Sequence, residues 1–279
     1  KYLTFKSTKF HFIIKQIFTF VFDMLKIHFL GTGTSQGIPI IGSKHPVCLS
    51  LNPKDKRLRV SIMITWEDVN LVIDCGPDFR QQMLKVNCET LDGILFTHEH
   101  ADHTAGIDDI RPFFFKQGEI PVYGSARVIE NLSRRFDYIF SNVNKYPGAP
   151  SVNTNVISHE SSFKFKNKTI HPIQLMHNTL SVLGYRIDDF AYLTDIKTIT
   201  DNEIKKLSEI DVLVLSALRI ESHPNHLNLE EALNLIHKIN PRRCYLTHIS
   251  HLMGFHDEVS NKLPENVFLA YDTLTITSD

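Results

Sequence analysis

The run Thr97-His98-Glu99-His100-Ala101-Asp102-His103 places three histidines and two carboxylates within seven residues. It follows an apolar segment, 91–96, whose composition indicates a buried strand. Burying so much polarity costs roughly several kcal/mol unless each group has a partner, and a divalent cation satisfies several groups at once. The H-x-H-x-D-H spacing therefore predicts ligands for two adjacent metal ions where a strand meets a loop. The alternative is a solvated, histidine-rich loop.

The composition of the chain limits the classes of protein to consider. With 279 residues and 42% hydrophobic content, it can bury one large core or two small ones. A net charge of −1 gives no overall attraction to nucleic acid or to an anionic membrane. The four cysteines are scattered and form no C-x-x-C pair, which indicates a reducing cytoplasm.

The first 23 residues are expected to differ from the rest of the chain. Their apolar stretch, 10–22, is interrupted by Lys15 and Gln16 and is too short to span a bilayer. Met24 directly precedes a segment typical of a strand, 25–30. We therefore expect Met24 to be the natural start, residues 1–23 to be a non-native or disordered leader, and 24–279 to form a single domain.

Short strand-like segments alternate with helix-like segments over residues 24–279, which predicts an α/β fold (α+β by some schemes). The clearest helix is 229–239, whose apolar residues recur at helical spacing behind a capping-box pair, Asn228 and Glu231. A second helix is expected over 125–139. The 144–155 stretch contains Pro147, Gly148 and Pro150 and is expected to be an exposed loop.

Four further polar residues also end apolar strands. They are Asp74, His177, Asp195 and His248. Strand ends at one edge of a sheet bring such side chains together, and ligands on rigid elements are held well. Taken singly, His177 and Asp195 would be an ordinary hydrogen-bonded histidine and a turn-forming aspartate. As a set downstream of H-x-H-x-D-H, they predict the remainder of a metal site.

These positions together resemble the complete ligand set of the metallo-β-lactamase superfamily. The resemblance covers 24–279 and implies an αββα sandwich, with two mixed sheets flanked by helices. It implies that one metal is held by His98, His100 and His177, and that a second is held by Asp102, His103 and His248. Asp195 would bridge both ions, and Asp74 would orient the histidine loop from behind the ligands.

Within the superfamily, the chain is most similar to the phosphoribosyl 1,2-cyclic phosphate phosphodiesterase group. The similarity is carried by segments 29–39, 56–59, 74–80 and 106–112. His226 stands where that group has a catalytic histidine. The resemblance implies a phosphodiesterase that opens a small cyclic phosphate with a metal-activated hydroxide, His226 acting as general acid alongside Asp102 and Asp195. Arg111 is a candidate for holding the phosphate.

That group also has a separate structural zinc, held by a C-x-C-x-x-C loop and a later histidine. The aligned residues here are Ser43, His45, Cys48 and His251, so two cysteines are replaced. A zinc site made of His45, Cys48 and His251, and no site at all, both remain open at this point. For the main centre, five imidazoles and two carboxylates without a thiolate would accept zinc, manganese or iron. The resemblance favours two manganese or zinc ions.

Three other functions remain as alternatives. A ribonuclease Z-like tRNA 3′-processing endonuclease shares the ligand set but usually carries a basic arm, and no basic insertion of that kind is seen here. A thioester or lactone hydrolase would use the same nucleophile. A non-catalytic carrier in cofactor biosynthesis could use the same scaffold. We expect a small-molecule phosphodiester as the partner, no nucleic acid, no membrane and, by default, a homodimer.

Overall fold

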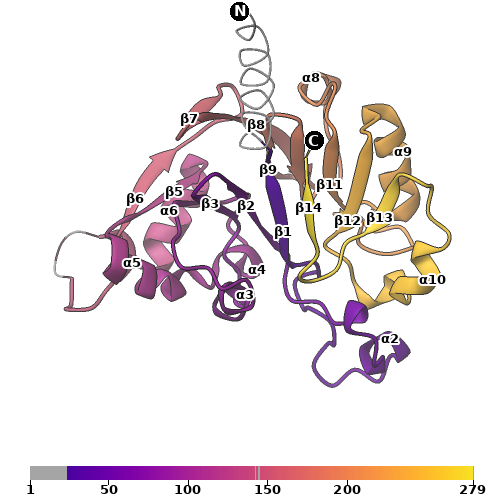
Figure 1. Cartoon of the computed structure of the whole chain (residues 1–279), viewed down its shortest axis with the longest axis horizontal. Helices are drawn as coiled ribbons and strands as arrows, with labels where there is room; N and C mark the ends of the chain where they lie inside the picture. Colours follow the sequence, from indigo (N-terminus) through magenta and orange to yellow (C-terminus); the bar gives the residue numbers. More distant parts are fainter. Residues whose placement is uncertain (1–23, 142, 144, 279) are drawn as a thin grey trace, which may run out of the picture.

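Two mixed β-sheets pack face to face, and helices cover their outer faces (Figure 1). The computed structural model describes residues 24–141, 143 and 145–278, so the leader expected at 1–23 lies outside the described residues. The order of layers is helices, sheet, sheet, helices, which confirms the αββα sandwich expected from the sequence.

Each sheet contains seven strands. The first, in spatial order, consists of β14 (Thr275–Thr277), β1 (Lys26–Gly31), β2 (Ser61–Trp66), β3 (Val69–Ile73), β4 (Gly93–Leu95), β5 (Ile120–Gly124) and β6 (Val152–Val156). The second consists of β13 (Val267–Leu269), β12 (Arg243–Thr247), β11 (Val212–Ser216), β10 (Phe190–Leu193), β9 (Leu180–Ile187), β8 (Lys168–His177) and β7 (Phe163–Phe165). Strands β3 to β6 run parallel to one another, as do β10 to β13.

Three hydrophobic clusters hold the four layers together. Alternation along a strand sends successive side chains to opposite faces, so Ile62 and Ile64 enter the cluster between the sheets while Met63 faces the first helical layer. The second sheet does the same, with Val214 facing inward and Leu215 facing α9. The central strands of both sheets are therefore buried on both faces, which explains why they are almost continuously apolar.

The helices are short. They are α2 (Pro46–Leu49), α3 (Phe79–Lys85), α4 (Ala101–Thr104), α5 (Arg111–Gln117), α6 (Ala126–Arg135), α7 (Asp137–Phe140), α8 (Asp201–Lys205), α9 (Leu229–Ile239) and α10 (His256–Ser260). The predicted helix 229–239 and its capping box are confirmed, since Asn228 and Glu231 exchange side-chain and backbone hydrogen bonds. The predicted helix 125–139 is instead two helices, because Phe136 leaves helical geometry at φ −129°, ψ 49°.

The expectation of an exposed loop over 144–155 was wrong at its end. Val152–Val156 forms β6, which pairs in parallel with β5 at the edge of the first sheet. The strand carries three asparagine and threonine residues, and its exposed edge position tolerates them, so no apolar run marks it in the sequence. Among the described residues, no helix combines the length and apolar character needed to cross a membrane.

Candidate metal centre

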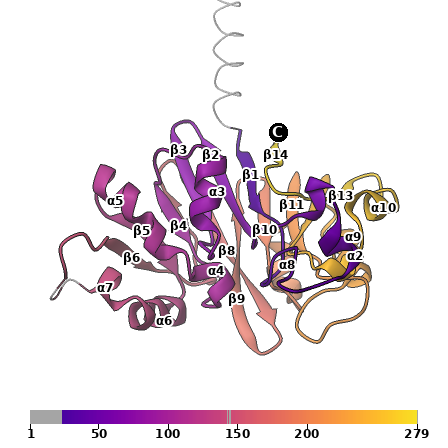
Figure 2. The same cartoon turned by 90° about the horizontal axis from the view of Figure 1, so that it is seen from below.

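The residues predicted to bind metal all leave the carboxyl ends of strands. Asp74 follows β3, and the histidine motif follows β4 and leads into α4. His177 is the last residue of β8, and His248 follows β12 directly. Asp195 is separated from the end of β10 by Thr194. In the view from below, α4 lies where the two halves of the molecule meet (Figure 2). The topology therefore brings ligands from both sheets to one edge of the sandwich.

Three of these residues have a left-handed backbone conformation. The φ angles are 65° at Asp74, 52° at Asp195 and 55° at His248. This region costs a residue with a β-carbon about 1–2 kcal/mol, and glycine would adopt it without that cost. Glycine, however, supplies no ligand. The sharp turn at each strand end is what aims the side chain into the site instead of along the sheet.

Two glycines, Gly76 and Gly106, let the backbone after β3 lie directly against the loop that carries the histidine motif. A β-carbon built on Gly76 would lie 2.1 Å from the backbone oxygen of Asp102, and one built on Gly106 would lie 2.0 Å from the oxygen of Gly76. Cys75 and His103 are hydrogen-bonded through their backbones at 2.7 Å. The end of β3 thus packs directly against α4, without an intervening side chain.

Asp74 is the hydrogen-bonding centre beneath the loop. Its Oδ1 accepts from the amide of Thr97 at 2.8 Å, and its Oδ2 accepts from the Thr97 hydroxyl at 2.8 Å and from Nδ1 of His103 at 2.6 Å. All three groups are buried. Because a carboxylate accepts from Nδ1, the Nε2 atom of His103 is left to face the cluster. This is the orienting role that the resemblance implied for Asp74.

Two further imidazoles are oriented in the same way. The Thr97 hydroxyl gives its proton to Asp74, so it accepts from Nδ1 of His98 at 3.0 Å. Nδ1 of His177 donates to the backbone oxygen of Asn225 at 2.8 Å. Each bond fixes the tautomer in which Nε2 carries the lone pair, which is the form that binds a metal ion.

The second predicted ligand set is brought together as expected. Nε2 of His103 lies 3.2 Å from Oδ2 of Asp102 and 3.2 Å from Oδ2 of Asp195. Nε2 of His248 lies 3.3 Å from Oδ1 of Asp195 and 3.9 Å from Oδ2 of Asp102. The ligand atoms of Asp102, His103 and His248 all lie within 4.8 Å of one another. Asp195 thus presents Oδ2 to His103 and Oδ1 to His248, and because both histidines belong to the second predicted set, its bridging role stays a prediction.

The first predicted set is arranged less closely. His98 groups with His103 and Asp195 within 4.8 Å, while His177 groups with Asp195 and His226. The exposed His100 belongs to none of these groups, although its ring lies 4.5 Å from that of His98 and 5.6 Å from that of His177. The assignment of His98, His100 and His177 to one ion stays a prediction.

His226 lies inside the cluster instead of at its rim. Its Nδ1 is 3.7 Å from Oδ1 of Asp195, and its ring lies 4.4 Å from that of His177 and 5.0 Å from that of His248. Its side chain is 12% exposed, so it can reach a bound molecule from within the protein. Burial, together with the neighbouring imidazole of His248, lowers the pKa of His226 to about 3.

The charges of the cluster oppose one another. Burial lowers the pKa of His98 well below its ordinary value, which keeps that imidazole neutral at pH 7. Burial acts on His103 in the same direction, but Asp195, Asp74 and Asp102 outweigh it and raise its pKa. The pKa of Asp195 falls despite burial, because His248 and His103 lie beside it. The pKa of Asp102 is lowered as well, so the carboxylates of Asp102 and Asp195 are ionised and need positive charge close by, whereas burial raises the pKa of Asp74.

The donor atoms fit divalent cations. Nε2 of His98, of His103 and of His248 are buried and have no hydrogen-bond partner among the described residues. An unpartnered buried nitrogen costs about 1–3 kcal/mol, which makes a repeated set of them at one point unusual. A cation coordinated by these nitrogens and the two carboxylates would satisfy all of them at once.

Arg111 is not part of the cluster. It donates to Oδ1 of Asp108 at 2.7 Å, to the Tyr146 hydroxyl at 3.2 Å and to the backbone oxygen of Gly148. These contacts hold the start of α5 against the loop after α7. A phosphate-holding role for Arg111 stays a prediction that none of these contacts supports.

The residues of the suggested structural zinc site meet only in part. The rings of His45 and His251 are 4.7 Å apart in an edge-to-face arrangement, and Cys48 is buried. Nδ1 of His45 accepts a hydrogen bond from the amide of Val47. Within the described part of the chain, His45, Cys48 and His251 do not form a group whose ligand atoms all lie within 4.8 Å. Whether they bind zinc stays a prediction.

Three contributors were missed in the sequence. Thr97 links Asp74 to His98, and the Asn225 backbone orients His177. His223 has its ring 5.1 Å from that of His226 and accepts the amide hydrogen of Asn225 on its Nδ1. The spacing His223-Pro-Asn-His226 was a usable signal, whereas a contribution from the backbone of Asn225 leaves no trace in residue type.

Comparison with known proteins places the chain in a family. A family model described as the beta-lactamase superfamily domain matches residues 69–249. A crystal structure described as a new diphosphatase from the PhnP family is 34% identical, with a TM-score of 0.85, and the match covers 91% of this chain and 97% of that one. This likeness extends over nearly all of both molecules.

Two curated relatives match over parts of their length. The octanoyltransferase of Porphyromonas gingivalis is 37% identical over 252 residues, which is 90% of this chain and 51% of that protein. The ribonuclease Z of Methanosarcina acetivorans is 32% identical over 108 residues, which is 37% of this chain and 30% of that protein. The chain thus spans about half the length of the first relative and less of the second.

Proposed function

This chain belongs to the metallo-β-lactamase superfamily of hydrolases, and we propose that it is a dinuclear metal-dependent phosphodiesterase that opens a small cyclic phosphate. The observation that carries the proposal is the convergence of oriented imidazoles and two carboxylates at one sheet edge, with His226 inside the cluster. The likeness to a phosphate-hydrolysing protein over nearly the whole chain supports phosphorus chemistry over carbonyl chemistry.

Two cations would be held by the predicted ligands. His98, His100 and His177 would bind one of them, Asp102, His103 and His248 would bind the other, and Asp195 would lie between. When bound, the cations would lower the pKa of a coordinated water and withdraw charge from a phosphoryl oxygen. A donor set of imidazoles and carboxylates suits manganese or zinc. Asp74 and Thr97 would keep the imidazoles aimed at the ions.

The proposed role of His226 is to protonate the leaving group. Opening a cyclic alkyl phosphodiester expels an alkoxide, which is strongly basic and needs a proton as the P–O bond breaks. His226 lies within the cluster and is not assigned to a metal ion, and the anionic phosphate of a bound substrate would raise the pKa of its ring. We assign it the delivery of that proton to the departing oxygen.

A diphosphatase is the second candidate, because a similar solved structure bears that description. The two reactions differ in what departs. A diphosphate releases a phosphate group, which is a much weaker base than an alkoxide and needs little protonation. A diphosphatase would therefore depend on the metal ligands and only weakly on His226. The two curated relatives add tRNA precursor and octanoyl thioester as further compounds to test.

The decisive experiment is metal removal followed by reconstitution. The chelated protein, reloaded with manganese or with zinc, is assayed on a five-membered cyclic ribose phosphate, a linear diphosphate, a precursor tRNA and an octanoyl thioester. We expect the highest kcat/KM on the cyclic phosphate and loss of all activity in His248→Ala. Preferred hydrolysis of any other compound would replace the proposal, and a fully loaded protein inactive on all four would favour a carrier.

A further inference from the structure

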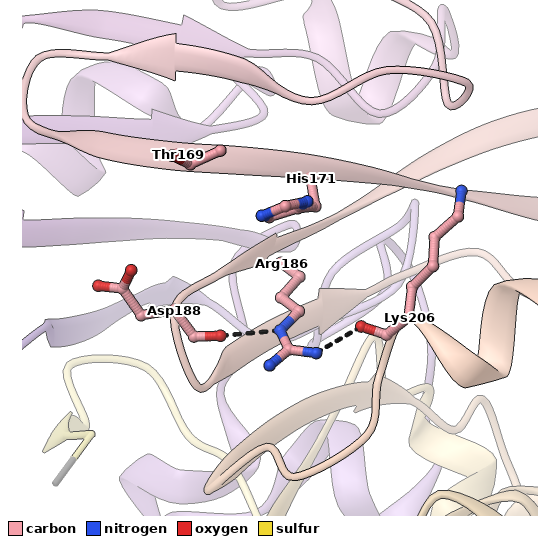
Figure 3. A pocket seen from close by; sticks show the side chains of 5 residues that line it. All are labelled: Thr169, His171, Arg186, Asp188 and Lys206. Carbon is pink, nitrogen blue, oxygen red and sulfur yellow. Dashed lines mark hydrogen bonds between the residues drawn. The ribbon is translucent and has the colours of Figure 1, made fainter.

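A second polar pocket lies on the outer face of the second sheet, away from the metal centre. It has a volume of about 550 Å³ and is lined by Thr169, His171, Arg186, Asp188 and Lys206 (Figure 3). His171 and the predicted ligand His177 lie on the same strand, β8, six residues apart. At about 3.3 Å per residue this separation is about 20 Å, so the pocket is a distinct site.

The strand register explains why these side chains share a face. His171 on β8 lies opposite Arg186 on β9, and cross-strand partners point to the same side of a sheet. Their neighbours Ile170 and Ile187 enter the core between the sheets, so His171 and Arg186 point outward. Farther along β8, Ile173 on this outer face is covered by the helical layer. The cover ends before His171, which is exposed.

Arg186 is held as a rigid donor. Its Nε donates to the backbone oxygen of Asp188 at 2.8 Å, and one terminal nitrogen donates to the backbone oxygen of Lys206 at 2.6 Å. Figure 3 shows both bonds, one on each side of the guanidinium. Within the part of the chain that the structure describes, the guanidinium charge is met by carbonyl oxygens and by no carboxylate. Arginine has more N–H groups than these bonds use, and the remaining ones are fixed in direction.

The carboxylates around the pocket already have partners. Asp188 pairs with Nζ of Lys168 at 2.7 Å, and the buried Glu203 pairs with Nζ of Lys206 at 2.8 Å. Asp188 and Glu203 are thus each offset by a lysine, which leaves the charge of Arg186 in excess in this first pocket. The pKa of His171 responds to this field: burial and the charge of Arg186 lower it. The pocket is therefore electropositive.

A second hollow extends the pocket. It has a volume of about 290 Å³, shares His171 and Lys206 with the first, and adds Glu160, Ser161 and Ser162 to the lining. The carboxylate of Glu160 places the acidic side of this hollow away from Arg186, which lines only the first pocket. An inorganic phosphate would occupy only part of this space, since pockets of some 300–1,000 Å³ accommodate ligands of drug size. The combination of one fixed guanidinium, an imidazole and several hydroxyl groups matches a phosphate with a polar organic remainder.

We propose that this pocket binds a small organic phosphate, with the phosphate on Arg186 and His171 and the hydroxyl-bearing remainder extending toward Ser161 and Ser162. The proposal does not depend on the reaction at the metal centre. A nucleic-acid strand fits less well, because most of the surrounding charges are paired and a polyanion needs a row of free cations.

Titration calorimetry of the metal-loaded full chain tests the proposal, with ribose 5-phosphate, inorganic phosphate and ribose as probes. We expect ribose 5-phosphate to bind more tightly than inorganic phosphate, and ribose to show no binding. Arg186→Met should weaken ribose 5-phosphate by at least about tenfold. The control Arg134→Met, which removes an exposed arginine on α6, should leave the affinity unchanged.

His171→Gln provides a second variant, because it replaces an exposed side chain and leaves the carbonyl contacts of Arg186 in place. It should also weaken ribose 5-phosphate. Binding at the metal centre would be insensitive to both variants, and that result would overturn the proposal. So would inorganic phosphate binding as tightly as ribose 5-phosphate, or no binding of ribose 5-phosphate at millimolar concentration.

Discussion

Replacing His226 by glutamine separates its proposed role from that of a metal ligand. Glutamine keeps a hydrogen-bonding group near the position of the ring but cannot deliver a proton. His226 is mostly buried, and its Nδ1 has no hydrogen-bond partner among the described residues, so little other structure depends on it. The fold and the ligand cluster should persist in the variant.

The size of the effect should depend on the substrate. Loss of a positioned general acid costs about 10²–10⁴-fold in rate, or about 3–5 kcal/mol of transition-state stabilisation, when the leaving group is a strong base. A cyclic ribose phosphate expels such a group. Bis(p-nitrophenyl) phosphate expels a phenolate that leaves without a proton, so His226→Gln should slow its hydrolysis by less than about tenfold. The ratio between the two substrates is the quantity that reports proton transfer.

The assay is kcat/KM for both substrates on manganese-loaded protein, with metal content measured on the same samples. Nδ1 of His226 lies close enough to Asp195 and His177 to be a ligand itself, so the metal measurement is essential. Equal losses on the two substrates together with a lower metal content would refute the general-acid assignment. Equal losses at full occupancy would indicate a role in binding the phosphate.

Asp74→Asn should weaken metal affinity by about 10–100-fold, measured by competition with a chelator. The carboxylate accepts hydrogen bonds from Thr97 and His103 on both of its oxygens, whereas an amide has a single accepting oxygen. Gly76→Ala should lower the melting temperature and the metal content, since the new β-carbon would meet the Asp102 backbone. The control Gly42→Ala places no atom within 4 Å of the new β-carbon, so it should lose only about 1 kcal/mol of stability, the cost of an alanine at a φ of 76°. Burial and the neighbouring arginine lower the pKa of His256 from 6.5 to about 4, so the folded state disfavours its protonation. Its contribution to stability is present above pH 6.5 and is lost as the pH falls through about 4. The loss in the free energy of unfolding between pH 6.5 and pH 4 amounts to at most about 3 kcal/mol. Urea titrations of His256→Gln should show an unfolding free energy that changes less with pH over this range.

The layers of the fold were readable from the sequence because burial on both faces leaves long apolar strands. The residues that meet in the cluster were readable because metal ligands are restricted to a few residue types and each of these residues follows such a strand. β6 was missed because an edge strand needs no apolar run, and Asn153 and Thr154 gave no signal. The break at Phe136 was missed because it is a change in backbone angle within a sequence that continues to favour helix.

The contacts of Arg111 could not be read from the sequence for a different reason. Its spacing in the chain put it near the histidine motif, and it does begin the helix that follows. Which way a long side chain points depends on partners supplied by distant residues, here Tyr146 and Gly148. The pocket around Arg186 has the same origin, because it exists only through the register of β8 against β9.

The strained backbone at Asp74, Asp195 and His248 supports the function of these residues independently of any relative. At each position glycine would relieve the strain, although it would also remove a buried side chain. The retention of a carboxylate or imidazole therefore needs a compensating interaction worth at least the strain, about 1–2 kcal/mol per residue. Asp74 receives it from Thr97 and His103. Asp195 receives part of it from the Thr194 hydroxyl, which donates to its Oδ2 at 2.8 Å. The ring nitrogens of His248 have no hydrogen-bond partner among the described residues, and a bound cation would supply the interaction there.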